Sequence, residues 1–288
     1  MTAAARPAVD PHLDDATFAR ELAEQAGRIL RERYERVERV DYKSAKDVVT
    51  EVDHLSERLV IDAIHAGFPS DGILAEESGA HPAAGKRARA HAAASHDEAP
   101  EVRALAVGRT WVIDPLDGTV NYANGLPFFC VSIGLVLDGR PVAGAVHDPM
   151  RDETFWATAG GPAMLGDRPI RASEKGSLGD FVVQAAIGGR AVTTRVRNLR
   201  KAIRVSRNVG SSALALVYVA NGRFDAFIQS GGMSAWDIAA AGLIAERAGA
   251  VVTDMAGGPW FDVDRSTRQF GAIAAPAPHH AELLRIVG

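Results

Sequence analysis

The chain has 288 residues with 32 basic and 36 acidic side chains, and this balance argues against a general nucleic-acid-binding protein, which usually carries a basic excess. Hydrophobic residues make up 47% and charged residues 24% of the sequence, as in a soluble globular protein of about two domains or one large α/β unit. The single cysteine, Cys130, excludes an internal disulfide framework and a thiolate metal cluster. The longest apolar run, 213–220, is far shorter than the roughly 18–20 residues of a membrane span. Residues 1–10 lack the apolar core of a signal peptide, so we expect a cytoplasmic protein.

The first half of the chain predicts two helices followed by strands. Apolar residues recur every four positions from Asp14 to about Val37 and along 53–66, so each segment is predicted to be a helix with one buried stripe. In the second helix the inward residues are expected to be Leu55, Leu59 and Ala63. Four strand-like runs follow, the last two joined by the turn pair Asp138-Gly139: 72–75, 110–113, 131–137 and 142–146.

Beyond residue 150 the chain alternates between strands and helices. A hairpin is expected between 154–157 and 168–171, turning near Gly166-Asp167. The elements predicted after it are strand 181–186, helix 212–220, strand 224–228, helix 237–248, strand 251–254, strand 272–274 and helix 279–286. One earlier segment, 80–108, has few large apolar side chains and is expected to be a loop or a poorly ordered helix.

Acidic residues gather where the predicted strands end. Glu76 and Glu77 follow one apolar strand, Asp114 and Asp117 follow the next, and Asp237 stands near a predicted helix start. Ligand sites collect at strand ends in layered α/β folds, and a donor set made only of oxygens favours Mg²⁺ or Mn²⁺ over zinc. Taken singly, Asp237 also fits a helix N-cap and the glutamate pair fits a solvated loop edge.

The hexapeptide DPLDGT at 114–119 is harder to explain as a bare turn. Pro115 and Gly118 force a sharp turn directly after an apolar strand. Gly118 lets the backbone approach a ligand closely, and the amides after it can open a helix whose N-terminus favours an anion. Two carboxylates beside such an anion cradle suit a metal-bound phosphate.

Four blocks of sequence, in this order, resemble the inositol monophosphatase family of Mg²⁺-dependent, lithium-sensitive sugar phosphatases. They are KSAKDVVT at 43–50 running on to Asp53, Phe68-Pro69 running on to EESG at 76–79, WVIDPLDGTVNYANGLPFFCVSIGL at 111–135, and SAWDIAAAG at 234–242. The resemblance covers residue 14 to the C-terminus, apart from 80–108. It implies an α/β (α+β) fold, a layered α/β/α/β/α sandwich of the inositol monophosphatase and fructose-1,6-bisphosphatase type. Residues 13–150 would supply the N-terminal helices and an antiparallel sheet with the metal motifs, and 151–288 would complete the site in one compact unit.

The resemblance also implies a role for each matching residue. Asp114 would bridge two ions and Asp237 would complete the second, in a set holding roughly two or three Mg²⁺, or Mn²⁺ instead. The implied metal ligands are Glu76, Asp114, the carbonyl of Leu116, Asp117 and Asp237. Thr119 with Asp53 resembles the dyad that orients and deprotonates the attacking water, and Glu76 belongs to the catalytic set as well. The implied phosphate and substrate contacts are the amides of Gly118 and Thr119, and then Gly210, Ser211 and Ser212. Glu77 resembles a supporting residue, as does Lys43, for which a surface lysine is the alternative.

One position departs from the family pattern. Gln229 stands where most relatives have a glutamate that binds a substrate hydroxyl, and Gly231-Gly232 indicates a one-residue insertion before Trp236. We expect Gln229 to contact the substrate and to weaken the preference for inositol itself, because a neutral amide accepts hydrogen bonds less strongly than a carboxylate.

These observations predict a Mg²⁺-dependent phosphomonoesterase that acts on inositol monophosphate or a related sugar or polyol phosphate. The alternatives within the superfamily are fructose-1,6-bisphosphatase, histidinol-phosphatase and 3′-phosphoadenosine nucleotidase activity. A regulatory binding protein on the same fold is the alternative of another class. The resemblance further implies lithium sensitivity and a homodimer. The charge balance and the lack of a long apolar run predict no nucleic-acid or membrane partner.

Overall fold

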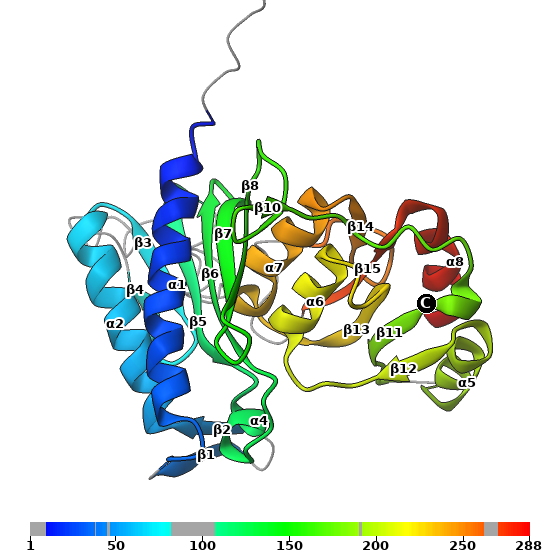
Figure 1. The fold of residues 1–288 in the computed structure, drawn as a ribbon, viewed down its shortest axis with the longest axis horizontal. Helices are drawn as coiled ribbons and strands as arrows, with labels where there is room; N and C mark the ends of the chain where they lie inside the picture. Colours follow the sequence, from blue (N-terminus) through cyan, green and yellow to red (C-terminus); the bar gives the residue numbers. More distant parts are fainter. Residues whose placement is uncertain (1–9, 38, 45–46, 82–106, 190–191, 262–269) are drawn as a thin grey trace, which may run out of the picture.

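The computed structural model describes residues 10–37, 39–44, 47–81, 107–189, 192–261 and 270–288. Its elements stack in five layers, which confirms the predicted α/β/α/β/α sandwich (Figure 1). Helices α1 (Leu13–Arg33) and α2 (Glu51–Gly67) form the first layer, and α6 (Ser212–Ala220) with α7 (Ala235–Arg247) the central one. Helices α5 (Val192–Ala202) and α8 (Ala277–Val287) form the last layer, and one sheet fills each gap.

The first sheet has eight strands. They are β3 (Gly72–Ala75), β4 (Gly79–His81), β5 (Arg109–Asp117), β6 (Cys130–Leu137), β7 (Arg140–Asp148), β8 (Glu153–Thr158), β9 (Met164–Leu165) and β10 (Arg168–Pro169). Their order is β10-β9-β8-β7-β6-β5-β3-β4, and only β3 and β5 run parallel. The carboxyl ends of β3 and β5 therefore lie side by side at the same end of the sheet, and the acidic motifs begin there.

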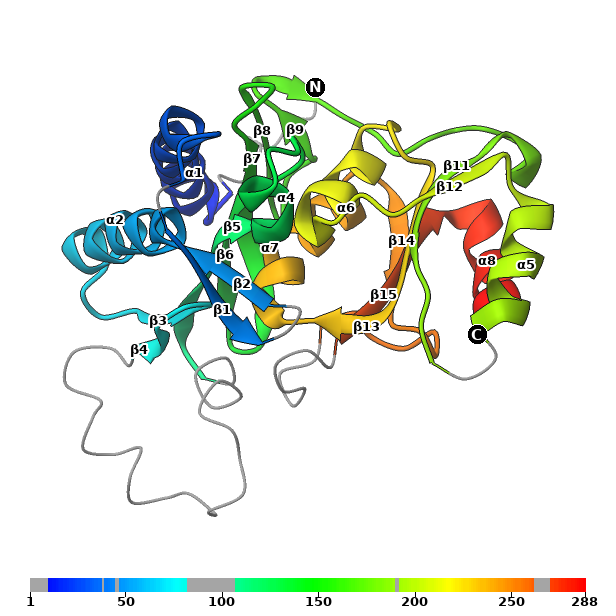
Figure 2. The same ribbon diagram turned by 90° about the horizontal axis from the view of Figure 1, so that it is seen from below.

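The second sheet has five strands. They are β11 (Val182–Ala186), β12 (Val205–Arg207), β13 (Ala226–Met233), β14 (Ala250–Thr253) and β15 (Phe270–Pro276). Their order is β12-β11-β13-β15-β14, with β11 parallel to both β12 and β13. Strand β13 ends just before α7 begins, so it leads back toward the first sheet (Figure 2).

Three apolar clusters fill the spaces between layers. One lies under α1 and α2, a second surrounds α6 and α7 between the sheets, and a third lies under α5 and α8. All eight residues after Ser212 in α6 are buried, which explains the unbroken apolar run at 213–220. Cys130 belongs to the central cluster. Within the described ranges, no helix combines the length and the apolarity needed to cross a membrane.

Some predicted elements were wrong in detail. In α2 the side chain of Leu55 is 40% exposed, contrary to the prediction. Leu59 and Ala63 are half-buried against the first apolar cluster as predicted, and the fully buried apolar residues are Val52, Val60 and Ile64. The inward face is shifted because it also buries polar residues: Ser56 Oγ donates to the carbonyl of Pro115 at 2.9 Å. In the first sheet, the turn at Gly166-Asp167 joins β10 to the short strand β9, and β8 pairs with β9.

Other elements were missed altogether. An antiparallel ribbon of β1 (Val40–Ser44) and β2 (Asp47–Thr50) precedes α2, and α5 and β12 follow β11. Helix α5 was overlooked although Val192, Val196 and Leu199 recur at helical spacing, and of these only Leu199 is fully buried. Of the segment expected to be a loop, only its two ends are described, and residues 82–106 lie outside the described ranges.

Candidate active site

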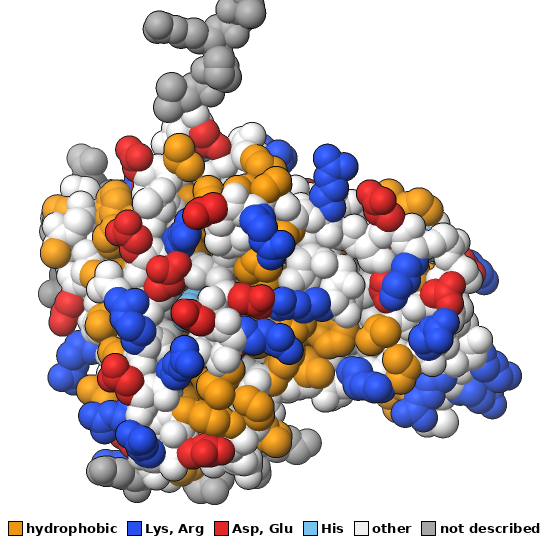
Figure 3. Space-filling view, in the orientation of Figure 1, with side chains coloured by type: hydrophobic (Ala, Val, Ile, Leu, Met, Phe, Trp, Pro, Cys, Tyr) orange, Lys and Arg blue, Asp and Glu red, His pale blue; other side chains and the backbone are white. Residues whose placement is uncertain are grey.

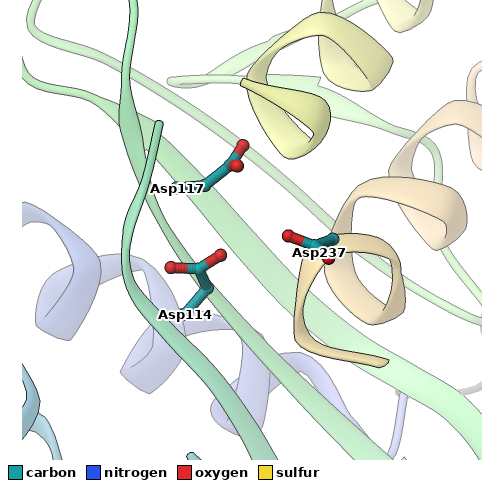
Figure 4. Close-up of side chains that lie close together, drawn as sticks. All are labelled: Asp114, Asp117 and Asp237. Carbon is teal, nitrogen blue, oxygen red and sulfur yellow. The ribbon is translucent and has the colours of Figure 1, made fainter. Parts of the chain in front are cut away.

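Three aspartates converge where β5 ends. Asp114 and Asp117 come from β5, and Asp237 comes from the first turn of α7. Oxygens of the three carboxylates lie within 4.8 Å of one another, and the side chains point into the same space (Figure 4). The strand bulges between Asp114 and Asp117, which turns both carboxylates toward that space. Glu76 directly follows the parallel strand β3, with its amide bonded to the carbonyl of Ile113 at 3.2 Å.

The electrostatics of this cluster favour a cation. Burial raises the pKa of Asp114 well above its usual range, and repulsion from Glu76, Asp117 and Asp237 raises it further. Burial also raises the pKa of Asp117, although hydrogen bonds from the Ser211 hydroxyl and from the start of α6 oppose this shift. A bound divalent cation would remove the repulsion, and oxygen-only donors suit Mg²⁺. The residues present therefore fit the metal that the sequence predicts.

Helix capping holds two of the predicted site residues in place. In α2 the N-cap is Thr50, and Asp53 sits three positions later, accepting from the Thr50 amide at 2.8 Å. In α7 the N-cap is Ser234, and Asp237 accepts from its amide at 2.5 Å. Asp237 is therefore not the N-cap itself, and each helix carries a reciprocal capping box that orients its aspartate.

The structure brings Thr119 and Asp53 together, as the resemblance implies. Thr119 Oγ1 lies 3.1 Å from Asp53 Oδ1 and 3.0 Å from the carbonyl of Leu116, and its single proton serves one acceptor at a time. Burial raises the pKa of Asp53 to about 6, against the opposing effect of hydrogen bonds from Thr50 and Thr119. A carboxylate with this pKa is a suitable general base near neutral pH.

Gly118 shapes the turn between these residues. Its φ is 97°, and a Cβ there would lie 3.0 Å from the carbonyl oxygen of Phe128. It precedes the short helix α4 (Thr119–Ala123), whose first amides follow directly on the acidic cluster. The side chain of Asn121 donates at 2.7 Å to the carbonyls of both Phe128 and Val209, which ties this turn to the segment before α6.

The start of α6 supports Asp117. Ser211 Oγ donates to Asp117 Oδ2 at 2.5 Å, and the Ala213 amide donates to the same oxygen at 2.7 Å. Ser211 is buried and was predicted to border the substrate, but in the structure its hydroxyl bonds to a predicted metal ligand. Ser212 is half-buried, and its hydroxyl donates to Gln229 Oε1 at 3.0 Å. Gln229 is therefore held beside the start of α6.

Three further residues were predicted to belong to the site: Gly210, Glu77 and Lys43. Gly210, with φ of 79°, packs against Asn121. The Glu77 amide donates to Glu57 Oε2 at 2.8 Å. Lys43 lies in β1, and its side chain is outside the described part of the structure. The sequence analysis did not identify Glu57, which is buried and lies one helical turn after Asp53. This spacing could have indicated that the two carboxylates share one face of α2.

The fold and the acidic cluster define a phosphatase of the layered α/β class. The sequence profile of the inositol monophosphatase family matches residues 13–287, and the chain belongs to that family. It is 35% identical over 262 residues to inositol monophosphatase 2 of Solanum lycopersicum, covering 88% of this chain and 91% of that protein. It is 36% identical over 264 residues to the Nus factor SuhB of Pasteurella multocida, covering 89% and 88%. The solved structure of a Thermotoga maritima IMPase superimposes with a TM-score of 0.79 at 31% identity, covering 96% and 97%.

Proposed function

We propose that the protein is a Mg²⁺-dependent phosphomonoesterase acting on inositol monophosphate or a related sugar or polyol phosphate. The observation that carries this proposal is the convergence of Asp114, Asp117 and Asp237. Beside them lie the Thr119–Asp53 pair and the backbone amides after Gly118. Phosphate hydrolysis needs charge neutralisation, a base for water and donors for phosphate oxygens, and this arrangement offers each of them.

The acidic residues would hold Mg²⁺, with Glu76 beside the three aspartates. When bound, Mg²⁺ would lower the pKa of the attacking water and stabilise the negative charge that develops on the phosphate and leaving group. The leucine at 116 contributes a backbone carbonyl near the same turn, within 3.0 Å of the Thr119 hydroxyl.

Backbone amides and side chains of the protein would position the phosphate, the attacking water and the alcohol part of the substrate. Amides of Gly118 and Thr119 would donate to phosphate oxygens and fix the phosphorus for in-line attack. The hydroxyl of Thr119 would accept a hydrogen bond from the attacking water and donate its own proton to Asp53. As the water attacks, its proton would pass to Thr119 while the Thr119 proton passes to Asp53. Ser212 and Gln229 would border the alcohol part of the substrate.

Phosphate release tests this proposal. The protein should hydrolyse inositol 1-phosphate and glycerol 2-phosphate with Mg²⁺, lose that activity in EDTA, and regain it when Mg²⁺ is restored. Metal-independent hydrolysis at the same rate would refute the mechanism. A non-enzymatic role of the kind suggested by the name Nus factor SuhB would instead give a folded protein that hydrolyses neither substrate.

A further inference from the structure

Three polar residues lie on one face of α2, and that face points into the molecule. Ser56 and Glu57 follow Asp53 by three and four positions, and none of the three is more than 4% exposed. Charged side chains of this helical layer usually reach water, as the acidic and basic residues scattered over α1 do (Figure 3). Burying polar side chains is unfavourable unless they are hydrogen-bonded, so the partners of this face indicate what it does.

Ser56 holds the bulge of β5 between the two aspartates. Its hydroxyl donates to the carbonyl of Pro115 at 2.9 Å, and the amide of the same peptide group, on Leu116, donates to Asp114 Oδ1 at 3.1 Å. The next carbonyl, that of Leu116, accepts instead from the Thr119 hydroxyl at 3.0 Å. Rotation of the planar peptide group between Pro115 and Leu116 would break the first two bonds together. Ser56 therefore helps to direct the Leu116 carbonyl, a predicted metal ligand.

Glu57 holds the turn after β3 in a similar way. Its Oε2 accepts from the Glu77 amide at 2.8 Å. The preceding amide, that of Glu76, donates to the carbonyl of Ile113 in β5 at 3.2 Å. Both amides that flank the α-carbon of Glu76 are therefore fixed, and they set the direction in which its side chain leaves the backbone. Because the acceptor on Glu57 is a carboxylate, its bond to the Glu77 amide is a strong one.

We propose that Ser56 and Glu57 are positioning residues of the metal site, which hold the Leu116 carbonyl and the Glu76 side chain in place for a divalent cation. The inference rests on the proposed function, because that proposal assigns the metal to the acidic cluster. Asp53, on the same face of α2, lies 3.1 Å from the Thr119 hydroxyl, so one helix positions the general base and two metal ligands together. Residues that orient metal ligands typically change metal affinity by about 10- to 100-fold.

Mn²⁺ binding, followed by the electron paramagnetic resonance of the free ion, tests the two residues without turnover. Ser56→Ala removes the donor and Glu57→Met removes the acceptor, and both new residues are good helix formers. Each variant should raise the Kd for Mn²⁺ about tenfold. Glu57→Gln keeps an acceptor at Oε1 and should bind Mn²⁺ nearly as well as the wild type. Glu57→Ala takes the place of Glu57→Met if the methionine variant does not fold.

Ile64→Val is the matched control for packing. Ile64 is fully buried in α2 about two turns beyond Glu57, where it belongs to the apolar cluster under the helix. This variant should lower the melting temperature and leave the Kd for Mn²⁺ unchanged.

Phosphate release from inositol 1-phosphate supplies a second readout. Ser56→Ala and Glu57→Met should need about tenfold more Mg²⁺ for half-maximal activity, while kcat and KM at saturating Mg²⁺ stay within about twofold of the wild type. A merely structural role would lower the melting temperature of these variants without changing the Mg²⁺ requirement.

The two readouts separate failure of the inference from failure of the proposed function. If the variants weaken Mn²⁺ binding as expected but the wild type hydrolyses no phosphate ester, the proposed function falls and the positioning role stands. If the wild type hydrolyses the ester and the Kd is unchanged in Ser56→Ala or in Glu57→Met, the inference is overturned. It is also overturned if Glu57→Gln weakens binding as much as Glu57→Met, because the charge of Glu57 would then matter and not its hydrogen bond. Equal weakening in Ile64→Val would attribute the effect to packing, with the same consequence.

Discussion

Replacing Asp114 by asparagine should abolish activity and yet stabilise the metal-free protein. The amide keeps the shape of the side chain and an Oδ1 acceptor for the Leu116 amide, which now bonds at 3.1 Å. It removes one charge from a cluster whose oxygens lie within 4.8 Å, where each pair of like charges repels by about 3.5 kcal/mol at an effective dielectric constant near 20.

Part of that repulsion is already relieved in the wild-type protein, because Asp114 has a raised pKa and takes up a proton more readily than in the unfolded chain. The folded state therefore loses stability as pH rises from the usual carboxylate range through the raised pKa. The Asp114→Asn variant has no carboxyl group at this position and should not lose stability in this pH range. We expect it to gain about 1–3 kcal/mol at pH 8 without metal, or roughly 2–6 °C in melting temperature.

Melting curves in EDTA and in Mg²⁺, combined with phosphate release, measure both effects. Mg²⁺ should raise the melting temperature of the wild type much more than that of the variant, and turnover should fall at least about a hundredfold. Asp148→Asn is the control: Asp148 is equally buried but bonds to the Tyr218 hydroxyl at 2.8 Å, away from the cluster. It should keep its response to Mg²⁺. Wild-type turnover in Asp114→Asn, or a lower melting temperature in EDTA with an unchanged Mg²⁺ response, would refute the reasoning.

Three further outcomes are expected. Thr119→Ala should lower kcat by about a hundredfold or more while Thr119→Ser retains most of it, since only a hydroxyl can bridge water and Asp53; equal rates would remove Thr119 from the mechanism. Gln229→Glu should raise kcat/KM for inositol 1-phosphate relative to glycerol 2-phosphate by about tenfold, mainly through KM, and an unchanged ratio would show that residue 229 does not contact the substrate. Li⁺ at millimolar concentration should inhibit uncompetitively or in a mixed manner, and insensitivity would count against a lithium-sensitive site, though not against metal catalysis.

Much of the acidic cluster could be anticipated because its members lie at positions with strong local signals. Asp114 and Asp117 stand beside Pro115 and Gly118 at the end of an apolar strand, and that pattern predicts where their backbone turns. The buried helix α6 and the hairpin at Asp138-Gly139 are equally local and were predicted correctly. Propensity and apolar periodicity suffice for such elements.

The features that the sequence did not predict depend on polar contacts between distant segments. The inward face of α2 was partly misassigned because Ser56 bonds to Pro115 within the bulge of β5 and Glu57 bonds to the turn after β3. Both are buried, and periodicity counts such residues as exposed. Two consecutive serines start α6, and nothing in their spacing tells that Ser211 faces Asp117 while Ser212 faces Gln229. Helix α5 was missed although Val192, Val196 and Leu199 are spaced as in a helix, because most of its residues are polar and Leu199 alone is fully buried.

The start of α6 bonds both to the acidic cluster and to Gln229, the proposed substrate contact. The Ser211 hydroxyl and the Ala213 amide bond to Asp117 and favour its ionised form, which opposes the effect of burial and prepares that carboxylate for a cation. One residue away, the Ser212 hydroxyl donates to Gln229 Oε1 at 3.0 Å. Since α6 is buried between the two sheets, a shift in their packing would move Asp117 and Gln229 together. Metal affinity and substrate preference are therefore expected to change together when residues under α6 are altered.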